Sequence, residues 1–163
     1  MKLLLDTHIW LWYLLGDQRL SLQLQTDIAD PNTELWLSPI SIWETLILAE
    51  KGRISLQPDP VTWVNLALKT LETREAQMNH SIAILSREIA LPRQYPGDRF
   101  IAATAIYYGL ILATVDANLT STSALQTLSY TIFYISVGEI PFFAGAIPYL
   151  IATLHALCAT IAL

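Results

Sequence analysis

The chain has 163 residues and a formal net charge of −5; 53% of its residues are hydrophobic and 14% are charged. This length suits one domain, and the composition excludes an intrinsically disordered chain, which would have less apolar material to bury and more charge. The single cysteine, Cys158, excludes an internal disulfide framework and a Cys-rich zinc site, and it favours a cytoplasmic protein. The acidic balance argues against nucleic-acid binding through a broad basic surface, but it is compatible with an enzyme that meets phosphate through a bound cation.

Strands and helices alternate along the predicted element order. Strands are predicted over 2–5, 34–37, 110–115 and 130–135. Helices are predicted from Asp6-Thr7 to Gly16, over 21–29, 39–51, 61–71, 80–89 and 98–108, and from 118. This alternation predicts an α/β domain with a mostly parallel sheet and helices on both faces. Ligands bind such sheets beyond the carboxyl ends of the strands, at the point where the strand order reverses.

Four carboxylates lie where that chemistry is expected. Asp6 and Asp116 each follow an apolar strand, and Asp98 opens the helix over 98–108. Glu44 falls within the stripe that we expect the helix over 39–51 to turn toward the core. That stripe consists of Ile40, Trp43, Ile47 and Leu48. Taken singly, each acid also has an ordinary structural interpretation, as a helix cap, a turn residue or a side chain that reaches solvent at the edge of the stripe.

The four carboxylates are more informative together, because a doubly wound sheet would bring them toward one region. Like charges at close range repel one another unless a cation lies among them. Carboxylate oxygens suit Mg²⁺ or Mn²⁺, and a cage that holds one or two such ions is a site for phosphodiester hydrolysis by a metal-activated water. We therefore expect Asp6, Glu44, Asp98 and Asp116 to be both metal ligands and catalytic residues.

The segments around these acids resemble the PIN-domain ribonucleases, and specifically the VapC-type toxins of bacterial toxin–antitoxin pairs. The matching segments are Leu3-Leu4-Leu5-Asp6-Thr7-His8, Ser38-Pro39-Ile40-Ser41-Ile42-Trp43-Glu44 with its continuation Glu50-Lys51-Gly52-Arg53-Ile54, Pro96-Gly97-Asp98-Arg99-Phe100-Ile101-Ala102-Ala103-Thr104-Ala105, and Leu112-Ala113-Thr114-Val115-Asp116-Ala117-Asn118. The resemblance covers residues 1–130, and it is the order of the four segments that makes it specific.

The resemblance implies a three-layer α/β/α PIN-like fold and a Mg²⁺- or Mn²⁺-dependent endoribonuclease that a VapB-like antitoxin inhibits; it leaves homodimer formation open. Asp6, Glu44, Asp98 and Asp116 match the acidic quartet of the family. The family pattern assigns supporting roles to Thr7, through its hydroxyl, and to Asn118, at a position where some members carry another polar or acidic ligand. For Arg99 three interpretations stay open: pairing with an acid of the site, contact with an RNA phosphate, or a structural salt bridge. Tyr95 stands where relatives often carry an acid, which leaves the quartet intact but puts the geometry of this loop in question.

Two alternatives to the nuclease remain at this level. One is a catalytically inactive PIN-fold binding module that retains antitoxin binding, which the unusual C-terminal segment and the Tyr95 substitution motivate. The other is phosphate-monoester hydrolysis with Asp6 as nucleophile, which would need a second acid two residues later, where the chain has His8. The three histidines, His8, His80 and His155, show no zinc-type spacing and are interpreted as structural or surface residues.

The C-terminal segment over 131–163 differs in character from the PIN-like domain over 1–130. It is hydrophobic, and Glu139 is its one formally charged residue. Residues 140–163 are long enough to cross a bilayer, which indicates a membrane anchor, but Pro141 and Pro148 interrupt them and no Lys or Arg flanks them. A membrane anchor, a folded addition and an altered reading frame are all compatible with this sequence.

Overall fold

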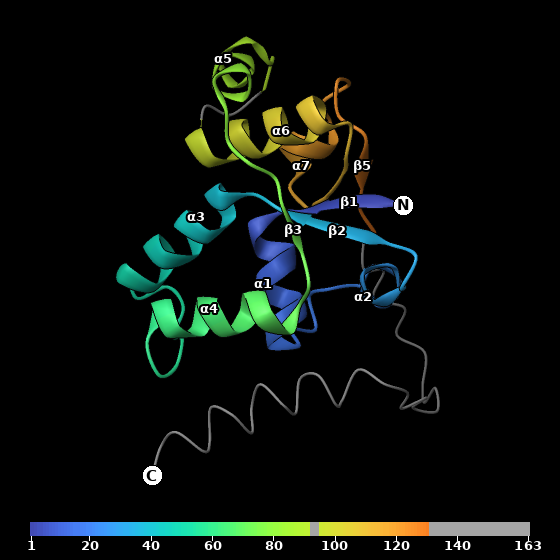
Figure 1. The fold of residues 1–163 in the computed structure, drawn as a ribbon. Coiled ribbons are helices and arrows are strands. Elements are labelled where there is room, and N and C mark those ends of the chain that lie inside the picture. Colours follow the sequence, from blue (N-terminus) through green and yellow to red (C-terminus); the bar gives the residue numbers. More distant parts are fainter. Residues whose placement is uncertain (92–94, 131–163) are drawn as a thin grey trace.

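The structure of the chain is a computed structural model that describes residues 1–91 and 95–130 (Figure 1). The strands are β1 (Lys2–Leu5), β2 (Glu34–Leu37), β3 (Arg74–Glu75), β4 (Ile111–Ala113) and β5 (Thr127–Leu128). The helices are α1 (Thr7–Leu15), α2 (Leu22–Ala29), α3 (Pro39–Glu50), α4 (Pro60–Thr70), α5 (His80–Glu88), α6 (Pro96–Tyr108) and α7 (Ala117–Thr120). The predicted α/β class is confirmed.

All strand pairs in the sheet are parallel, and the strand order is β3-β2-β1-β4-β5. The chain therefore moves outward from β1 through β2 to β3 and then returns to the other side of β1 for β4 and β5. The order reverses between β1 and β4, which pair with each other through Leu3–Leu5 and Ile111–Ala113. Asp6 follows the carboxyl end of β1 directly and Asp116 follows that of β4 after two residues, so the topology places these two acids at the expected ligand-binding edge.

The central strands are buried on both faces, so their alternate side chains enter two different cores. Leu3 and Leu5 of β1 pack with residues of α1, α2 and α4, whereas Leu4 packs with residues of α5 and α6. The same alternation occurs in β2, where Leu35 and Leu37 face the first core and Trp36 the second. Figure 1 shows the resulting three layers, with α1 and α4 on one side of the sheet and α5 and α6 on the other.

Local sequence signals explain where the helices begin and end. The Asp6 side chain accepts from the Thr7 N–H as the N-cap of α1, and the Ser38 hydroxyl accepts from the Ile40 N–H at the start of α3. Pro39 and Pro96 occupy the first turns of α3 and α6, where a missing N–H costs nothing. Gly109 ends α6 in the left-handed conformation, with φ of 62°.

Four details of the predicted elements need correction. The two-residue strand β3 was not predicted, because its side chains are exposed and carry no apolar pattern. The last strand, β5, lies at Thr127–Leu128; the strand predicted over 130–135 falls almost entirely outside the described residues. Helix α6 begins at Pro96, two residues earlier than predicted. In α3 the buried residues are Ser41, Glu44 and Thr45, while Trp43 is 48% exposed, because the helix packs mainly on α1, α4 and α6 rather than flat on the sheet.

Within residues 1–91 and 95–130, no helix is long and apolar enough to span a membrane. The predictions for the C-terminal segment over 131–163, the membrane anchor at 140–163 included, concern residues outside the described part of the chain.

Candidate active site

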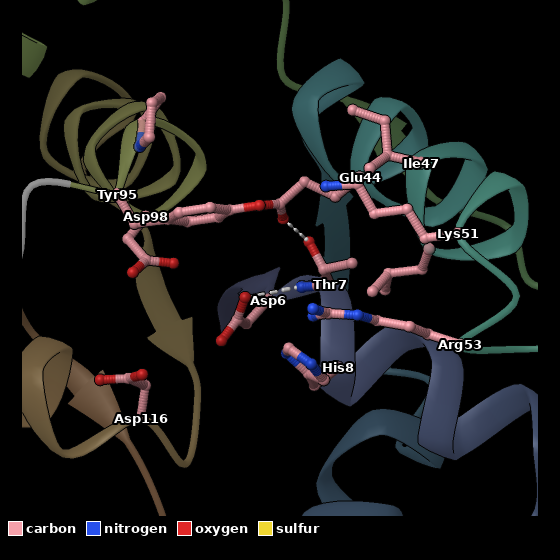
Figure 2. A pocket seen from close by; sticks show the side chains of 12 residues that line it. Asp6, Thr7, His8, Glu44, Ile47, Lys51, Arg53, Tyr95, Asp98 and Asp116 are labelled. Carbon is pink, nitrogen blue, oxygen red and sulfur yellow. Dashed lines mark hydrogen bonds between the residues drawn. The ribbon is translucent and has the colours of Figure 1, made fainter.

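A pocket of about 600 Å³ opens at the carboxyl edge of the sheet, between the α3 side and the α6–α7 side of the molecule (Figure 2). Its lining brings together all four acids of the predicted quartet. They come from four different places in the fold: the end of β1, the middle of α3, the first turn of α6 and the end of β4. The other lining residues are Thr7, His8, Ile47, Leu48, Lys51, Arg53, Tyr95 and Pro96.

Asp6 is buried at the base of the pocket and is held from two sides. Its Oδ1 accepts from the Thr7 N–H at 2.7 Å, and its Oδ2 accepts from the Thr114 hydroxyl at 2.7 Å. The Thr114 oxygen in turn accepts from the Asp116 N–H at 3.1 Å. The fully buried Thr114 therefore links the ends of β1 and β4, and it fixes the carboxylate of one acid and the backbone of another.

Glu44 reaches the pocket from the buried face of α3 and is held by the first residue of α1. The Thr7 hydroxyl donates to Glu44 Oε2 at 2.5 Å. On the far side of the carboxylate lies Gly97, in the first turn of α6. A Cβ atom at this glycine would stand 1.9 Å from Glu44 Oε1, so the absence of a side chain at Gly97 is what leaves room for Glu44.

Asp98 and Asp116 line the opposite side of the pocket (Figure 2). The Asp98 side chain is half-buried and, within the described residues, makes no hydrogen bond. Asp116 is the N-cap of α7, and its Oδ1 accepts from the backbone N–H of Asn118 at 2.6 Å and from the side-chain amide of Asn118 at 2.8 Å. Asp6 and Asp116 are thus helix caps and pocket acids at once, so the structural and functional interpretations of these residues are compatible.

Burial and mutual repulsion raise the pKa values of Asp6, Glu44 and Asp98. Burial is the main cause for Asp6, and the nearby Asp116 adds to it, whereas the Thr114 hydrogen bond acts in the opposite direction. For Glu44 the raised pKa also comes first from burial and then from Asp6, against the hydrogen bond from Thr7. Burial together with the charges of Asp6, Asp116 and Glu44 raises the pKa of Asp98 to about 6. The four acids therefore act on one another electrostatically as a single group.

This donor set fits a hard divalent cation. All four acids offer carboxylate oxygens, and a cation among them would relieve the repulsion that raises their pKa values. Within the described residues, no three Asp, Glu, His or Cys side chains converge closely enough to surround one ion directly. Mg²⁺ typically takes one or two protein carboxylates and keeps several waters, so it does not need direct contact with every acid of the pocket.

The supporting residues differ in position. Thr7 and Asn118 contact Glu44 and Asp116, as described above, but Arg99 extends away from the pocket. Its buried guanidinium donates to the carbonyls of Ser86, Arg87 and Ile89 at 2.6, 3.1 and 2.8 Å, and so holds the last turn of α5.

Sequence reasoning missed several residues of the site. Thr114 and Gly97 lay inside the matched segments, but nothing in their identity showed that one would hold Asp6 and the other would make room for Glu44. His8 was interpreted as structural or surface; it is exposed and lines the pocket. Lys51 and Arg53 lie in the matched segment 50–54, but the sequence analysis gave them no role at the site. The helical spacing of Lys51 from Glu44 was the signal that could have placed Lys51 at the pocket.

Comparisons with known proteins identify the family to which the chain belongs. The family model described as "PIN domain" matches residues 3–125. The chain is 34% identical over 121 residues to Ribonuclease VapC22 of Mycobacterium tuberculosis, which covers 72% of this chain and 89% of the relative.

Solved structures with the same fold include VapBC2 of Rickettsia felis, bound to a DNA fragment from its promoter, with 15% identity, a TM-score of 0.57, and coverage of 78% of this chain and 98% of that one. VapBC-1 of nontypeable Haemophilus influenzae matches with 19% identity, a TM-score of 0.53, and coverage of 78% and 97%. FitAcB of Neisseria gonorrhoeae matches with 16% identity, a TM-score of 0.52, and coverage of 78% and 96%. At these identities the three structures support the fold.

Proposed function

Because the chain belongs to the PIN-domain family and groups there with the VapC-type proteins, we propose that it is a metal-dependent endoribonuclease that acts as the toxin of a toxin–antitoxin pair. The observation that carries the proposal is the convergence of Asp6, Glu44, Asp98 and Asp116 in one pocket at the switch point of the sheet. The relative named as a ribonuclease supports RNA as the substrate class.

In this proposal the four acids hold Mg²⁺ or Mn²⁺, and Thr7 and Thr114 hold two of the acids. When bound, such an ion polarises a phosphate oxygen and lowers the pKa of a water that attacks the phosphodiester. Asp6 and Glu44 supply fixed carboxylate oxygens, because each accepts a threonine hydrogen bond that limits its rotation. Asp98 supplies a carboxylate whose pKa of about 6 lets it exchange a proton for a cation near neutral pH.

The partners in the proposal are an RNA substrate and a VapB-like antitoxin. Two of the structural neighbours carry the name VapBC. This supports a VapB-like protein as the partner of this chain. A homodimer also remains part of the proposal. An enzyme that acts on cellular RNA in bacteria works in the cytoplasm, and this is where we place it.

The test is RNA cleavage by the purified full chain in Mg²⁺ or Mn²⁺. We expect Asp6→Asn and Asp98→Asn each to lower the cleavage rate by more than about a hundredfold, since even partners outside the first coordination shell typically contribute 10–100-fold. Glu88→Gln is the matched control, because it removes a carboxylate from the exposed end of α5 and should leave the rate unchanged.

Cleavage that persists in both asparagine variants would contradict the assignment of the site. A chain that neither cuts RNA nor gains thermal stability from Mn²⁺ would instead fit the inactive binding module, because a ligand that binds only the folded state must stabilise it.

A further inference from the structure

One side of the pocket carries cations as well as acids. Lys51 and Arg53 both line the pocket, and both are exposed. Glu44, Ile47, Leu48 and Lys51 recur at helical spacing, so a single face of α3 borders the pocket for two turns, with Glu44 at one end and Lys51 at the other. At a rise of about 1.5 Å per residue, Lys51 lies about 10 Å beyond Glu44 along the helix.

The end of α3 places Arg53 by backbone hydrogen bonds. Gly52 has φ of 65°, its N–H donates to Ala49 O at 2.9 Å, and the Arg53 N–H donates to Leu48 O at 2.9 Å. These two bonds form a Schellman motif, which turns the chain back over the last turn of the helix. Arg53 consequently extends from the end of α3 into the pocket, as Figure 2 shows.

Neither cation serves an evident structural purpose. Arg19 pairs with Asp17, Arg74 pairs with Glu34, and the buried Arg99 holds α5. Lys51 and Arg53 make no ion pair or side-chain hydrogen bond within residues 1–91 and 95–130, and the same is true of the exposed Lys69 and Arg87. Of these four side chains, Lys51 and Arg53 are the two that border the pocket with the four acids. Exposed long side chains that are left unpaired beside a pocket remain available to an anionic ligand.

We propose that Lys51 and Arg53 bind a phosphate of single-stranded RNA that neighbours the scissile phosphate. This inference rests on the proposed nuclease function and adds a substrate contact to it. A chain of phosphates approaching four carboxylates meets repulsion that a bound cation relieves only locally, so the flanking phosphates need cations of the protein. Arg53 offers a planar fork for two phosphate oxygens, and Lys51 offers a point charge beside it. Lys51 follows Glu44 by two turns of α3 and Arg53 lies just past the end of this helix, so the pair is assigned to a neighbouring phosphate rather than to the reacting one.

The experiment compares the full chain with the double variant Lys51→Gln/Arg53→Gln. Binding of a fluorescein-labelled single-stranded RNA is measured by anisotropy in Ca²⁺ at several salt concentrations, and cleavage is measured in Mg²⁺. The matched control, Lys69→Gln/Arg87→Gln, removes the same charge from exposed positions on α4 and α5. Melting temperature and the stabilisation by Mn²⁺ are recorded for each protein, to separate a substrate contact from damage to the fold or to the acids.

We expect the Lys51/Arg53 variant to bind RNA about tenfold more weakly at low salt. Its salt dependence should also be shallower, by about 0.7 in the slope of log K against log salt, for the one phosphate of a single strand that is no longer neutralised. KM should rise while kcat and the Mn²⁺ effect stay near those of the unaltered chain.

An equal loss of affinity in both double variants would show only a general charge effect and would overturn the inference. The inference would also be overturned if the Lys51→Gln/Arg53→Gln variant had the same RNA affinity and salt slope as the unaltered chain. In either case cleavage by the unaltered chain would leave the proposed function standing. A chain that neither binds nor cleaves RNA would overturn both.

Discussion

Two parts of the acidic pocket differ in how firmly they are held. Asp6 and Glu44 are buried, and each accepts a hydrogen bond from a threonine hydroxyl at 2.7 and 2.5 Å. The side chain of Asp98, across the pocket, is half-buried and makes no hydrogen bond within the described residues. The first two carboxylates are positioned before any ligand arrives, whereas Asp98 can adjust.

The comparison indicates how one pocket can contain both carboxylates of fixed position and a carboxylate that exchanges a proton. A fixed carboxylate needs no ordering when a cation binds, so less binding free energy is lost. An untethered carboxylate with a pKa of about 6 can instead gain or lose its proton as the site fills. We expect changes to the fixed part to alter activity through geometry, and changes to Asp98 to alter it through charge.

Gly97→Ala should have the largest effect on the tethered carboxylates, because it displaces Glu44. The new Cβ would lie 1.9 Å from Glu44 Oε1, so the carboxylate would have to leave its position against Thr7. Because a misplacement of about 1 Å can cost about a hundredfold, we expect a loss of that size in the rate of RNA cleavage. The helix should survive, since alanine is a better helix former than glycine.

A double-mutant cycle with Glu44→Gln shows whether Gly97 acts through Glu44. If it does, Gly97→Ala will add little to the loss already caused by Glu44→Gln. Additive losses would mean that the alanine disturbs another part of the pocket.

Thr114→Val should come next, because it removes two hydrogen bonds without changing the shape of the side chain much. Asp6 would lose the partner of its Oδ2 and the Asp116 N–H would lose its acceptor, which should destabilise the fold by about 1–3 kcal/mol. Cleavage should fall about tenfold, the lower end of what partners of metal ligands contribute. Denaturant melts and cleavage rates measure the two effects.

Thr104→Val is the control for this variant. Thr104 is also fully buried, but its hydroxyl donates within α6 to Phe100 O at 2.7 Å. It should lower stability without lowering the cleavage rate of the remaining folded protein. A Thr114→Val protein that cleaves RNA like the Thr104 control would show that Asp6 needs no support from β4.

Most of the fold and the acidic residues of the site can be predicted from the sequence, for a physical reason. Leu3–Leu5 and 110–115 are apolar runs that end at an aspartate, and in a parallel sheet the ends of neighbouring strands meet at one edge. The order of the strands follows from right-handed crossovers. Asp6 and Asp116 could therefore be placed near each other from the sequence.

The sequence does not reveal contacts that depend on the exact rotation and approach of helices. Trp43 was expected in the core because apolar periodicity cannot tell which side of α3 meets α6; the structure buries Ser41 and Thr45 instead. The closeness of Gly97 to Glu44 joins residues that lie far apart in the chain. Arg99, beside Asp98 in sequence, points to α5 because successive helical residues face different directions.

The smallest expected effect concerns Asp98 and pH, and it sharpens the contrast with the tethered acids. Its folded pKa of about 6 lies above the ordinary value of 3.8, so the metal-free fold is favoured while Asp98 is protonated and loses that stability as pH rises through 6. After allowance for solvent screening, this amounts to about 1 kcal/mol, or about 3–6 °C in melting temperature between pH 5 and pH 7. Stabilisation by Mn²⁺ should change in the opposite direction and grow over the same range, because the ion must displace the proton. Asp98→Asn should flatten both trends in thermal melts, whereas Glu88→Gln should not. If the asparagine variant keeps the pH dependence of the unaltered chain, the titration belongs to the tethered pair, and Asp98 is not the adjustable member of the site.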